Sequence, residues 1–440
     1  MSKHHVVIIG GGFGGLYAAQ AFKNQHDVQV TLIDKRNFHL FQPLLYQVAT
    51  GGLSPGDIAS PLRAVLKNHK NVKTVMGEVI DIDVSRQEVV LRDETIGYDA
   101  LIVATGVTHS YFGNSEWGKI APGLKTIEDA IEMRRKIFLA FEGAERQDDA
   151  DEIRAWMNFV IVGGGPTGVE LAGALAELAN HTLRRDFRSI DTSKVNIVLV
   201  EGAGRVLPPY HADLSEDAED HLRNLGVNVK TNTFVTNIDG DQVTMKRDGR
   251  EETLRAKTVL WAAGVQASPL GRILADRATA SLDRIGRVMV DENLAIPNHP
   301  EIMVIGDLAH CIGKDDKPLP GIAPVAMQQG DFAARFVEAR MQRRAIKPFH
   351  YFDKGNMAVI GRNAAVADIH GVHVKGFLAW LMWLFVHILY LVEYDNRLLV
   401  ATQWGWNYFT RNRGARLITH QDNLSLKKKN QKQHDMKYYE

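Results

Sequence analysis

Two stretches of this 440-residue chain carry the same pattern: His5–Gly15, with the sequence HVVIIGGGFGG, and Phe159–Glu170, with the sequence FVIVGGGPTGVE. In each, a short β-branched run leads into G-x-G-x-x-G, and an alanine-rich stretch follows. The first glycine lets the chain turn off a strand, the second lets the backbone approach a pyrophosphate, and the third lets a helix pack against the strand. The helix N-terminus then directs free N–H groups at the phosphates. One match is weak evidence, but two in a strand–turn–helix context predict two dinucleotides in one protein, and therefore electron transfer between them.

Each fingerprint is followed by an apolar strand that ends in an acid. Val30–Ile33 ends in Asp34, and Ile197–Val200 ends in Glu201. A carboxylate at this position suits the two hydroxyls of an adenosine ribose and repels a 2′-phosphate. Glu201 therefore favours NADH over NADPH, although Arg205, four residues on, keeps the phosphorylated cofactor possible. The plainer alternative is that both acids only cap strand ends.

Composition narrows the chemistry. Lys and Arg number 52, as do Asp and Glu, so nothing suggests nucleic acid binding. The single cysteine, Cys311, cannot form a disulfide relay, an intrachain disulfide or a cysteine-held iron–sulfur cluster. We expect it to be a small buried thiol, and we expect electrons to pass directly from a flavin to the acceptor. No metal site is expected.

Three further apolar stretches end in small residues: Tyr98–Gly106, Thr258–Val265 and Glu301–Asp307. Small strand ends let a dinucleotide or a crossing chain approach closely. Asp307 follows a glycine and can accept hydrogen bonds from flavin ribitol hydroxyls. It could equally be the N-cap of a following helix.

These patterns predict one domain inserted into another. We assign residues 1–122 and 286–345 to the two parts of a flavin-binding domain, and residues 123–285 to an inserted nicotinamide-binding domain. Residues 346–416 form a C-terminal membrane-associated segment, and residues 417–440 form a basic tail that we expect to be flexible.

The C-terminal segment contains the run Phe377–Val392, in which only His387 is clearly polar. A membrane-spanning helix needs about 20 residues, so this run is too short to span. It is apolar on all sides, which suits a helix lying in a bilayer interface or one buried on every side. Residues 393–440 hold nine basic and five acidic side chains, a net charge of +4, and several aromatic residues. Aromatic and cationic residues together favour the surface of an anionic membrane; a buried dimer-interface helix is the alternative.

Beyond the fingerprints, Asn37–Gly51, Tyr351–Arg362 and the helix with Trp380, Trp383 and His387 resemble the type II (non-proton-pumping) NADH:quinone oxidoreductases. The resemblance runs from the first fingerprint to about residue 416. It implies an α/β fold with two Rossmann-like dinucleotide-binding domains, glutathione reductase-like, and a C-terminal membrane-anchoring helical segment.

The same resemblance implies the partners. FAD would be held noncovalently in the first site, and NADH would bind in the second as electron donor. A membrane quinone, ubiquinone or menaquinone, would accept the electrons without proton pumping. The protein would be a homodimer held peripherally on the bilayer surface, at the cytoplasmic face of the inner membrane.

Candidate site residues follow from the motifs and the resemblance. The FAD site comprises Gly10, Gly12, Phe13, Gly14, Gly15, Asp34, Lys35, Ala104, Thr105, Gly106, Asp307 and Ala326. The NADH site comprises Gly163, Gly165, Pro166, Thr167, Gly168, Glu170, Glu201, Ala263 and Gly264. The quinone site comprises Ala323, Pro324, Gln328, Gln329 and Lys354.

Glu170 and Gln328 are the candidate catalytic residues. By resemblance, Glu170 positions the nicotinamide and assists proton movement toward the quinone; otherwise it is a carboxylate favoured by the helix dipole. The family's quinone motif is commonly A-Q-x-A-x-Q, whereas Ala323–Gln328 reads APVAMQ, with Pro324 in the first glutamine position. One quinone contact is then lost, and quinone preference can differ.

Two other classes of function fit the same fold less well. A sulfide:quinone oxidoreductase needs reactive cysteines, and an NAD(P)H-dependent reductase of a small redox protein does not need the apolar C-terminal run. A flavin-binding partner without turnover ranks last, because both fingerprints and both acids are intact.

Overall fold

The run before the first fingerprint forms β1 (His4–Ile9) in the computed structural model, which describes residues 3–419. β1 pairs in parallel with β2 (Val28–Asp34) and β9 (Ala100–Val103). Each of these strands is buried almost throughout, as expected for a parallel sheet covered on both faces. The complete sheet has the order β20-β21-β9-β1-β2-β5, with β5 (Val72–Met76), β20 (Ala295–Ile296) and β21 (His299–Val304).

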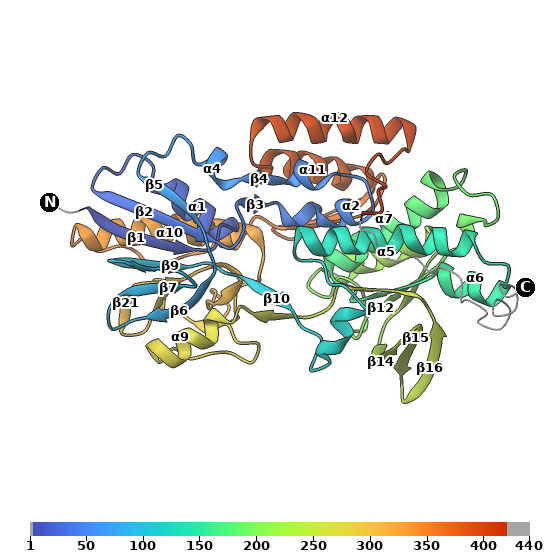
Figure 1. The fold of residues 1–440 in the computed structure, drawn as a ribbon, viewed down its shortest axis with the longest axis horizontal. Helices are drawn as coiled ribbons and strands as arrows, with labels where there is room; N and C mark the ends of the chain where they lie inside the picture. The colour runs from blue at the N-terminus through green and yellow to red at the C-terminus, as the bar shows by residue number, and fades with distance from the viewer. Residues whose placement is uncertain (1–2, 420–440) are drawn as a thin grey trace, which may run out of the picture.

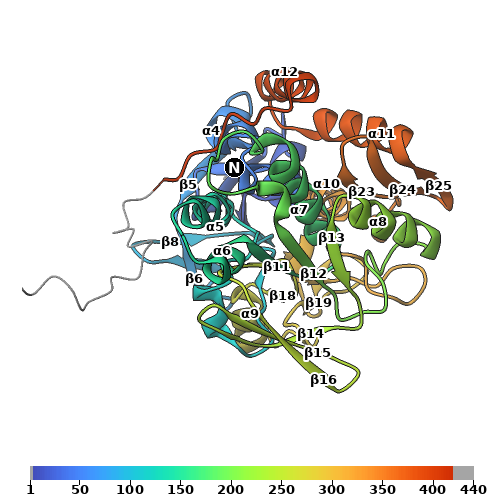
Figure 2. The same ribbon diagram turned by 90° about the vertical axis from the view of Figure 1, so that its right-hand side faces the viewer.

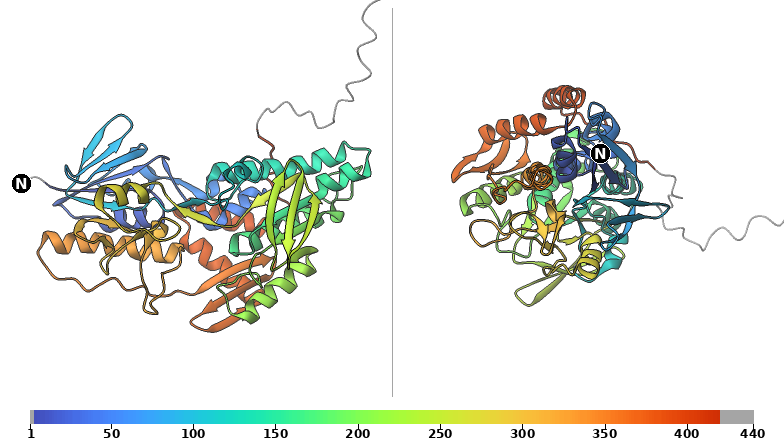
Figure 3. Two further views of the ribbon diagram at one scale, coloured as in Figure 1. Left: turned by 90° about the horizontal axis from the view of Figure 1, so that it is seen from below. Right: turned by 90° about the vertical axis from the view of Figure 1, so that its left-hand side faces the viewer.

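The second fingerprint forms the corresponding strand of a second parallel sheet. β11 (Asn158–Val162) lies between β12 (Asn196–Val200) and β17 (Thr258–Trp261), and β13 (Val227–Lys230) pairs with β12. Figure 1 shows the two sheet domains side by side along the long axis, and Figure 3 shows the same division from below. The expected α/β architecture with two dinucleotide-binding domains is confirmed.

The chain crosses between the domains in a two-stranded antiparallel ribbon. β10 (Val107–His109) leaves the first domain and β18 (Val265–Ala267) returns to it. After the return, α9 (Leu270–Ala278) packs its apolar face into the core of the first domain. This ribbon lies about 15 residues before the boundaries expected at residues 123 and 285, because the chain crosses directly after the small-residue turns that follow β9 and β17.

The remaining elements fill the two domains and the connections. Next to the first sheet are β3 (Phe38–Leu40), α3 (Pro55–Ile58), β4 (Ala59–Pro61), α4 (Leu62–Val65), β6 (Val79–Asp83), β7 (Glu88–Leu91), β8 (Thr95–Gly97), β19 (Val288–Met289) and β22 (Ala309–His310). α2 (Leu45–Ala49) follows β3 in the sequence but packs against helices of the second domain. The second domain adds α5 (Ile127–Glu145), α6 (Ala150–Met157), α8 (Ala212–Asn224), β14 (Phe234–Asp239), β15 (Gln242–Arg247) and β16 (Arg250–Arg255).

Each fingerprint helix packs so closely against a later segment of the chain that only glycine fits at the contact. α1 (Phe13–Ala21) follows the first fingerprint and lies against α10 (Ala323–Met341), where a Cβ on Gly330 would lie 2.3 Å from the carbonyl oxygen of Gly14. α7 (Pro166–Glu177) follows the second fingerprint and lies against β23 (Asn356–Gly361), where a Cβ on Gly173 would lie 1.6 Å from the carbonyl oxygen of Ile360. Residues 323–361 are thereby fixed against both fingerprint helices.

The C-terminal segment is a small sheet followed by two helices. β23, β24 (Ala364–Ile369) and β25 (Val372–Lys375) are antiparallel, and α11 (Gly376–Tyr390) packs on β24. α12 (Tyr394–Thr410) lies outermost, beside α11 (Figures 1 and 2). The sequence analysis foresaw one apolar helix here but neither the sheet nor α12. Within residues 3–419, no helix is both long enough and apolar enough to cross a bilayer.

Candidate functional site

The two fingerprints adopt the same backbone geometry. The first glycine of each has a positive φ, +103° at Gly10 and +109° at Gly163, which glycine adopts without strain. A Cβ on the third glycine, Gly15 or Gly168, would lie 1.8 Å from the carbonyl oxygen of that first glycine. Strand and helix therefore meet at a distance that only these glycines permit.

The second glycine of each fingerprint faces open space. A Cβ on Gly12 or Gly165 would meet no atom of residues 3–419 within 4 Å. Each glycine is also the N-cap of its helix, and neither helix start is capped by a side chain. We call the glycine-rich loop of each fingerprint, Gly10–Gly15 or Gly163–Gly168, a cradle. Free helix N–H groups beside this open loop fit a pyrophosphate at both positions. Phe13 and Gly14 begin α1, and Pro166 and Thr167 begin α7.

The two ribose acids also match each other in detail. Asp34 accepts hydrogen bonds from the backbone N–H of Gly11 (2.6 Å) and of Arg36 (2.7 Å). Glu201 accepts them from Gly164 and Ala203, both at 2.6 Å. Each carboxylate thus lies beside the glycine that separates the first and second fingerprint glycines, Gly11 or Gly164, where an adenosine ribose would lie. This geometry goes beyond simple strand-end capping.

Different charged groups lie near the two acids. Burial raises the pKa of Asp34, partly offset by the N–H of Gly11. Arg205 donates to the carbonyl oxygens of Pro208 and Tyr210, both at 3.0 Å, so its guanidinium is already engaged by the backbone. That engagement weakens the alternative in which Arg205 receives a 2′-phosphate. Lys35 borders a surface hollow beside Arg36.

The ends of β9, β17 and β21 complete the two cradles. Gly106, Gly264 and Gly306 follow these strands, each with a positive φ between +66° and +69°. A Cβ on Gly10 would lie 2.5 Å from the carbonyl oxygen of Ala104, and one on Gly163 would lie 2.8 Å from that of Ala262, the neighbour of Ala263. Thr105 has a buried hydroxyl that lacks a hydrogen-bond partner within the described residues. An unpaired hydroxyl beside the first cradle fits a polar ligand there.

Asp307 lies inside a 3-10 turn (Gly306–Leu308) whose N-cap is Ile305, so the N-cap alternative for this turn is wrong. Burial raises the pKa of Asp307. Gln329 supports the turn: its side-chain oxygen accepts the N–H of Gly306 at 2.7 Å, and the residue is 1% exposed. The structure therefore places Gln329 behind Asp307 rather than on an open quinone-facing surface.

The start of α10 carries the altered quinone motif. Pro324 lies in its first turn, and Ala323 is its first residue. The backbone oxygen of Ala326 would lie 3.4 Å from a Cβ on Gly14, so this turn adjoins the first fingerprint. The Gln328 amide forms two hydrogen bonds of 2.9 Å with the backbone of Phe352, one as donor and one as acceptor.

Lys354 lies two residues beyond that contact and reaches the C-terminal helix. Its ammonium donates to the hydroxyl of Tyr390 on α11 at 2.8 Å and lies 5.3 Å from the centre of that ring. Burial raises the pKa of Tyr17 on α1, and Tyr390 and Asp331 add to the shift. Burial also raises the pKa of Asp331 on α10, which the charge of Lys354 opposes. Gln328 and Lys354 thus connect α10 to the C-terminal segment.

Glu170 lies on the first turn and a half of α7, facing the C-terminal sheet. Burial raises its pKa to about 8, although the backbone of Val359 donates a hydrogen bond that opposes the shift. A carboxyl group with this pKa is mostly protonated at neutral pH and can release its proton in the physiological range. A simple helix-dipole carboxylate would instead remain ionised.

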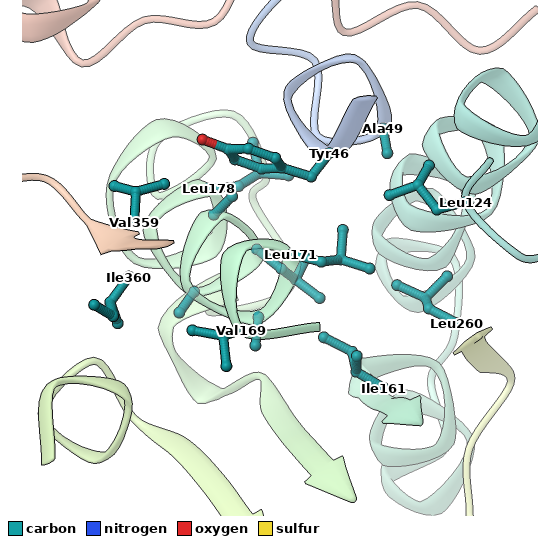
Figure 4. Close-up of a cluster of buried hydrophobic side chains, with 14 of the residues drawn as sticks. Tyr46, Ala49, Leu124, Ile161, Val169, Leu171, Leu178, Leu260, Val359 and Ile360 are labelled. Carbon is teal, nitrogen blue, oxygen red and sulfur yellow. The ribbon is translucent and has the colours of Figure 1, made fainter. Parts of the chain in front are cut away.

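The sequence analysis missed Tyr46, which lies beside Glu170. Tyr46 comes from α2 and lies across α7 on the buried cluster drawn in Figure 4, with its hydroxyl directed toward the side of Val359. Burial and the charge of Glu170 raise the pKa of Tyr46 well above its ordinary value. Gln47 donates to the Tyr46 hydroxyl at 3.0 Å and accepts from the indole of Trp404 at 2.8 Å. Asn37–Gly51 was singled out as a motif, but nothing local marks Tyr46 within it.

Aromatic rings connect the first cradle with α11. Phe13 meets His39 at 5.0 Å and Phe41 at 5.8 Å between ring centroids. Phe41 meets His387 edge to face at 6.2 Å, and His387 stacks on Trp383 at 4.1 Å. Burial lowers the pKa of both His39 and His387 to about 4, so both are neutral at physiological pH.

Cys311 is buried, as expected, and is 6% exposed. Burial raises the pKa of its thiol to about 11, and a hydrogen bond with Gln329 opposes the shift. A thiol with so high a pKa is a poor nucleophile at neutral pH.

The outer faces of α11 and α12 are apolar and exposed. Large apolar side chains are at least 42% exposed at Phe377, Leu378, Leu381, Phe385 and Leu389 of α11, and at Tyr394, Leu398, Leu399, Trp406 and Phe409 of α12. The inner face of α11 is buried, with Ala379 at 0% and Trp383 at 2% exposure. In the monomer α11 is therefore not buried on every side. A contiguous exposed apolar surface of this kind marks a membrane or protein contact.

Comparison with known proteins identifies the family to which the chain belongs. Residues 4–330 match the family described as pyridine nucleotide-disulphide oxidoreductase, and residues 354–412 match the NDH2 C-terminal domain. Two type II NADH:quinone oxidoreductases of Mycobacterium tuberculosis, Ndh and NdhA, are 44% and 45% identical to this chain. Each alignment covers 95% of this chain, and 91% and 90% of the two relatives. The enzyme of Staphylococcus haemolyticus is 29% identical, over 86% of this chain and 93% of its own length.

Solved structures agree on the fold. NDH2 from Plasmodium falciparum, in complex with NADH, superimposes with a TM-score of 0.86 at 22% identity, covering 95% of this chain and all of the other. The sulfide:quinone oxidoreductase of Aquifex aeolicus superimposes with a TM-score of 0.73 at 19% identity, covering 90% of this chain and 92% of the other.

Proposed function

This chain belongs to the type II NADH:quinone oxidoreductases, within the pyridine nucleotide-disulphide oxidoreductase family, and from that membership we propose how its residues divide the reaction. It is an NADH:quinone oxidoreductase and not a reductase of a small redox protein. The finer assignments below concern the cofactor, the site residues, the membrane face and the dimer.

FAD binds in the first cradle and NADH in the second. The open space at Gly12, the paired N–H acceptance by Asp34 and the unpaired hydroxyl of Thr105 support the first assignment. The open space at Gly165 and the placement of Glu201 support the second. When bound, FAD would take a hydride from NADH and pass two electrons to the quinone.

The protein's own groups position the reactants and handle protons. Glu170, with a pKa of about 8, holds a proton that it can release or accept near neutral pH, and Tyr46 lies next to it as a neutral phenol. Gln328 fixes the loop at Phe352, and Lys354 holds that loop to Tyr390 of α11. Gln329 acts from behind by fixing the turn of Asp307, in place of the direct quinone contact expected from the sequence.

One observation carries the quinone assignment. Close packing of α1 on α10 at Gly330 places the start of the altered motif, including Ala326, beside the first cradle. Ala323 and Pro324 line the same turn, and α11, with its exposed apolar face, adjoins the loop that Gln328 and Lys354 hold. A lipid-soluble quinone can then reach the cradle from the face that meets the bilayer. The acceptor is ubiquinone or menaquinone.

We test the cofactor assignment with Gly12→Val. The added side chain would occupy the space left for the pyrophosphate, so the purified variant should lose the yellow flavin colour and flavin-dependent NADH oxidation. Gly56→Val is the control, because Gly56 lies on α3, is exposed and has no described atom within 4 Å of its Cβ position. A flavin-loaded Gly12→Val protein would contradict the assignment.

The exposed faces of α11 and α12 form the membrane contact, so the protein is peripheral, at the cytoplasmic face of the inner membrane. Its tail charge, counted from the sequence, favours anionic lipid. Replacing Phe385, Leu389 and Trp406 together by Gln should release the protein from phosphatidylglycerol-containing vesicles in a flotation assay. Met289→Gln with Ile312→Gln is the control, because both residues are exposed and apolar but lie elsewhere.

The same variants distinguish a membrane contact from a homodimer contact at α11 and α12. If α11 and α12 form the homodimer contact instead, the triple variant should sediment as a monomer while the unmodified protein stays a soluble dimer that does not float. We expect the triple variant to remain a dimer, as the unmodified protein is. Deletion from residue 375 is a poor test, because it removes Ala379 and Trp383 from the core.

A further inference from the structure

We propose that His211, Asp213 and His373 bind a divalent first-row transition-metal ion on the surface of the protein, away from both dinucleotide cradles and beyond the redox function. One nitrogen of each imidazole and one carboxylate oxygen lie within 4.8 Å of one another. The three residues come from two parts of the chain: His211 and Asp213 from the start of α8, and His373 from β25.

The ligand atoms already converge on one point. Nδ1 of His211 lies 2.6 Å from Oδ1 of Asp213, and Nδ1 of His373 lies 3.1 Å from the same oxygen. The two imidazole rings lie 4.4 Å apart between centroids. Two ligands of a tetrahedral ion with bonds of about 2.1 Å are roughly 3.4 Å apart, so small side-chain rotations open the site to a metal.

The chemistry selects the class of ion. Two imidazoles suit Zn²⁺, Cu²⁺, Ni²⁺ or Fe²⁺, whereas a single carboxylate is too few oxygen ligands for Ca²⁺ or Mg²⁺. The His211 side chain is 63% exposed and that of Asp213 39%, so an ion can enter from solvent and keep water in a fourth position.

Lys375 sets the orientation of the carboxylate and opposes the ion. Its ammonium lies 3.3 Å from Oδ2 of Asp213 and donates to the Asp213 backbone oxygen at 2.9 Å. Oδ1 is thereby turned toward the two imidazoles. The same positive charge disfavours a nearby cation, so the site should bind more weakly than one without the lysine.

Occupancy would join two parts of the molecule. α8 belongs to the second dinucleotide-binding domain, while β25 runs directly into α11, which begins at Gly376. An ion held by His211 and His373 would therefore fix the NADH-binding domain to the strand that leads into the apolar helix. Binding to the folded state alone would also raise stability with ion concentration.

The test is calorimetric titration of the full-length, flavin-loaded protein with ZnCl₂, after chelator treatment, in a buffer that does not bind metals. We expect one stoichiometric binding event that His211→Gln and His373→Gln each weaken by tenfold or more. His221→Gln is the matched control, because His221 pairs with Asp217 on the same helix without a second histidine. It should leave the event unchanged.

Two further measurements test the site: the Zn²⁺ affinity of Lys375→Met and the thermal unfolding of the variants with Zn²⁺. Lys375→Met should bind Zn²⁺ several-fold more tightly, because a like charge beside the ion is removed. Zn²⁺ should raise the midpoint of thermal unfolding of the unmodified protein and of His221→Gln, but not of His373→Gln. Equal Zn²⁺ binding by the unmodified protein and His373→Gln, or no stoichiometric event, would overturn the site. Because flavin content and NADH oxidation are measured on the same samples, failure of this site is distinct from failure of the redox assignment.

Discussion

Trp404 on α12 donates its indole N–H to the side-chain oxygen of Gln47 on α2, over 2.8 Å and across 357 positions of sequence. Gln47 in turn donates to the hydroxyl of Tyr46, which lies beside Glu170. The outermost helix of the C-terminal segment is therefore tied by two hydrogen bonds to Tyr46, whose pKa the charge of Glu170 helps to raise.

Trp404→Phe should lower the free energy of unfolding by about 1 to 2 kcal/mol, because it keeps an aromatic ring but removes the indole N–H and leaves the Gln47 oxygen without its donor. Trp406→Phe is the control: its ring is 66% exposed, so its replacement should have little effect. Thermal unfolding of both variants measures the difference. Equal midpoints for the two would show that the indole hydrogen bond does not hold α12 in place.

Glu201→Gln should reduce the preference for NADH over NADPH by roughly tenfold. The amide oxygen can still accept one backbone N–H, but the charge that repels a 2′-phosphate is gone. Arg205 stays bound to backbone carbonyls, so we expect most of the change in the KM for NADH. Steady-state kinetics with both donors measure it, with the exposed Glu216→Gln as control. An unchanged ratio would point to a different acid.

Glu170→Gln should remove a pH dependence of stability. The folded-state pKa is about 8 and the ordinary value 4.5, so the folded protein holds an extra proton between these pH values. Its stability relative to the unfolded chain therefore falls as pH rises through that window. Glutamine imitates the protonated acid, so the variant should gain of order 2 kcal/mol on the unmodified protein between pH 5 and pH 9. The control variant Glu142→Gln, at an exposed side chain, should not gain stability over this pH range.

The same Glu170→Gln protein should turn over quinone 10- to 100-fold more slowly, because the amide cannot transfer a proton. Flavin content should be unchanged. Chemical denaturation and quinone reductase assays across pH, on the same preparations, separate the two effects. A variant with full activity at every pH would show that Glu170 only stabilises the structure.

Cys311→Ser should keep quinone reductase activity within about twofold. The thiol is buried, its pKa is about 11, and the chain has no second cysteine for a relay. The hydroxyl can keep the contact with Gln329, so stability should fall by only about 1 kcal/mol. Loss of electron transfer in a flavin-loaded, folded variant would instead reveal a chemical role for the thiol.

The sequence by itself determined the two cradles and their acids. Gly10, Gly15, Gly163 and Gly168 are required by local backbone geometry, namely a positive φ or a Cβ position 1.8 Å from a carbonyl oxygen. Such constraints act within a few residues and are therefore visible as a motif. The family, the fold and the NADH:quinone activity were confirmed. The expected basic tail beyond residue 419 lies outside the described residues.

Only the tertiary structure decided which side chains meet. Tyr46 lies close enough to Glu170 for its pKa to be affected, Trp404 donates to Gln47, and Gln329 accepts the N–H of Gly306. Nothing in the neighbouring sequence marks these contacts. The crossing ribbon β10–β18 and the helix α12 were likewise not foreseen. The physical reason is that such contacts join segments tens to hundreds of residues apart. Their geometry is set by close helix and strand packing at Gly330 and Gly173, which brings residues 323–361 against both fingerprint helices.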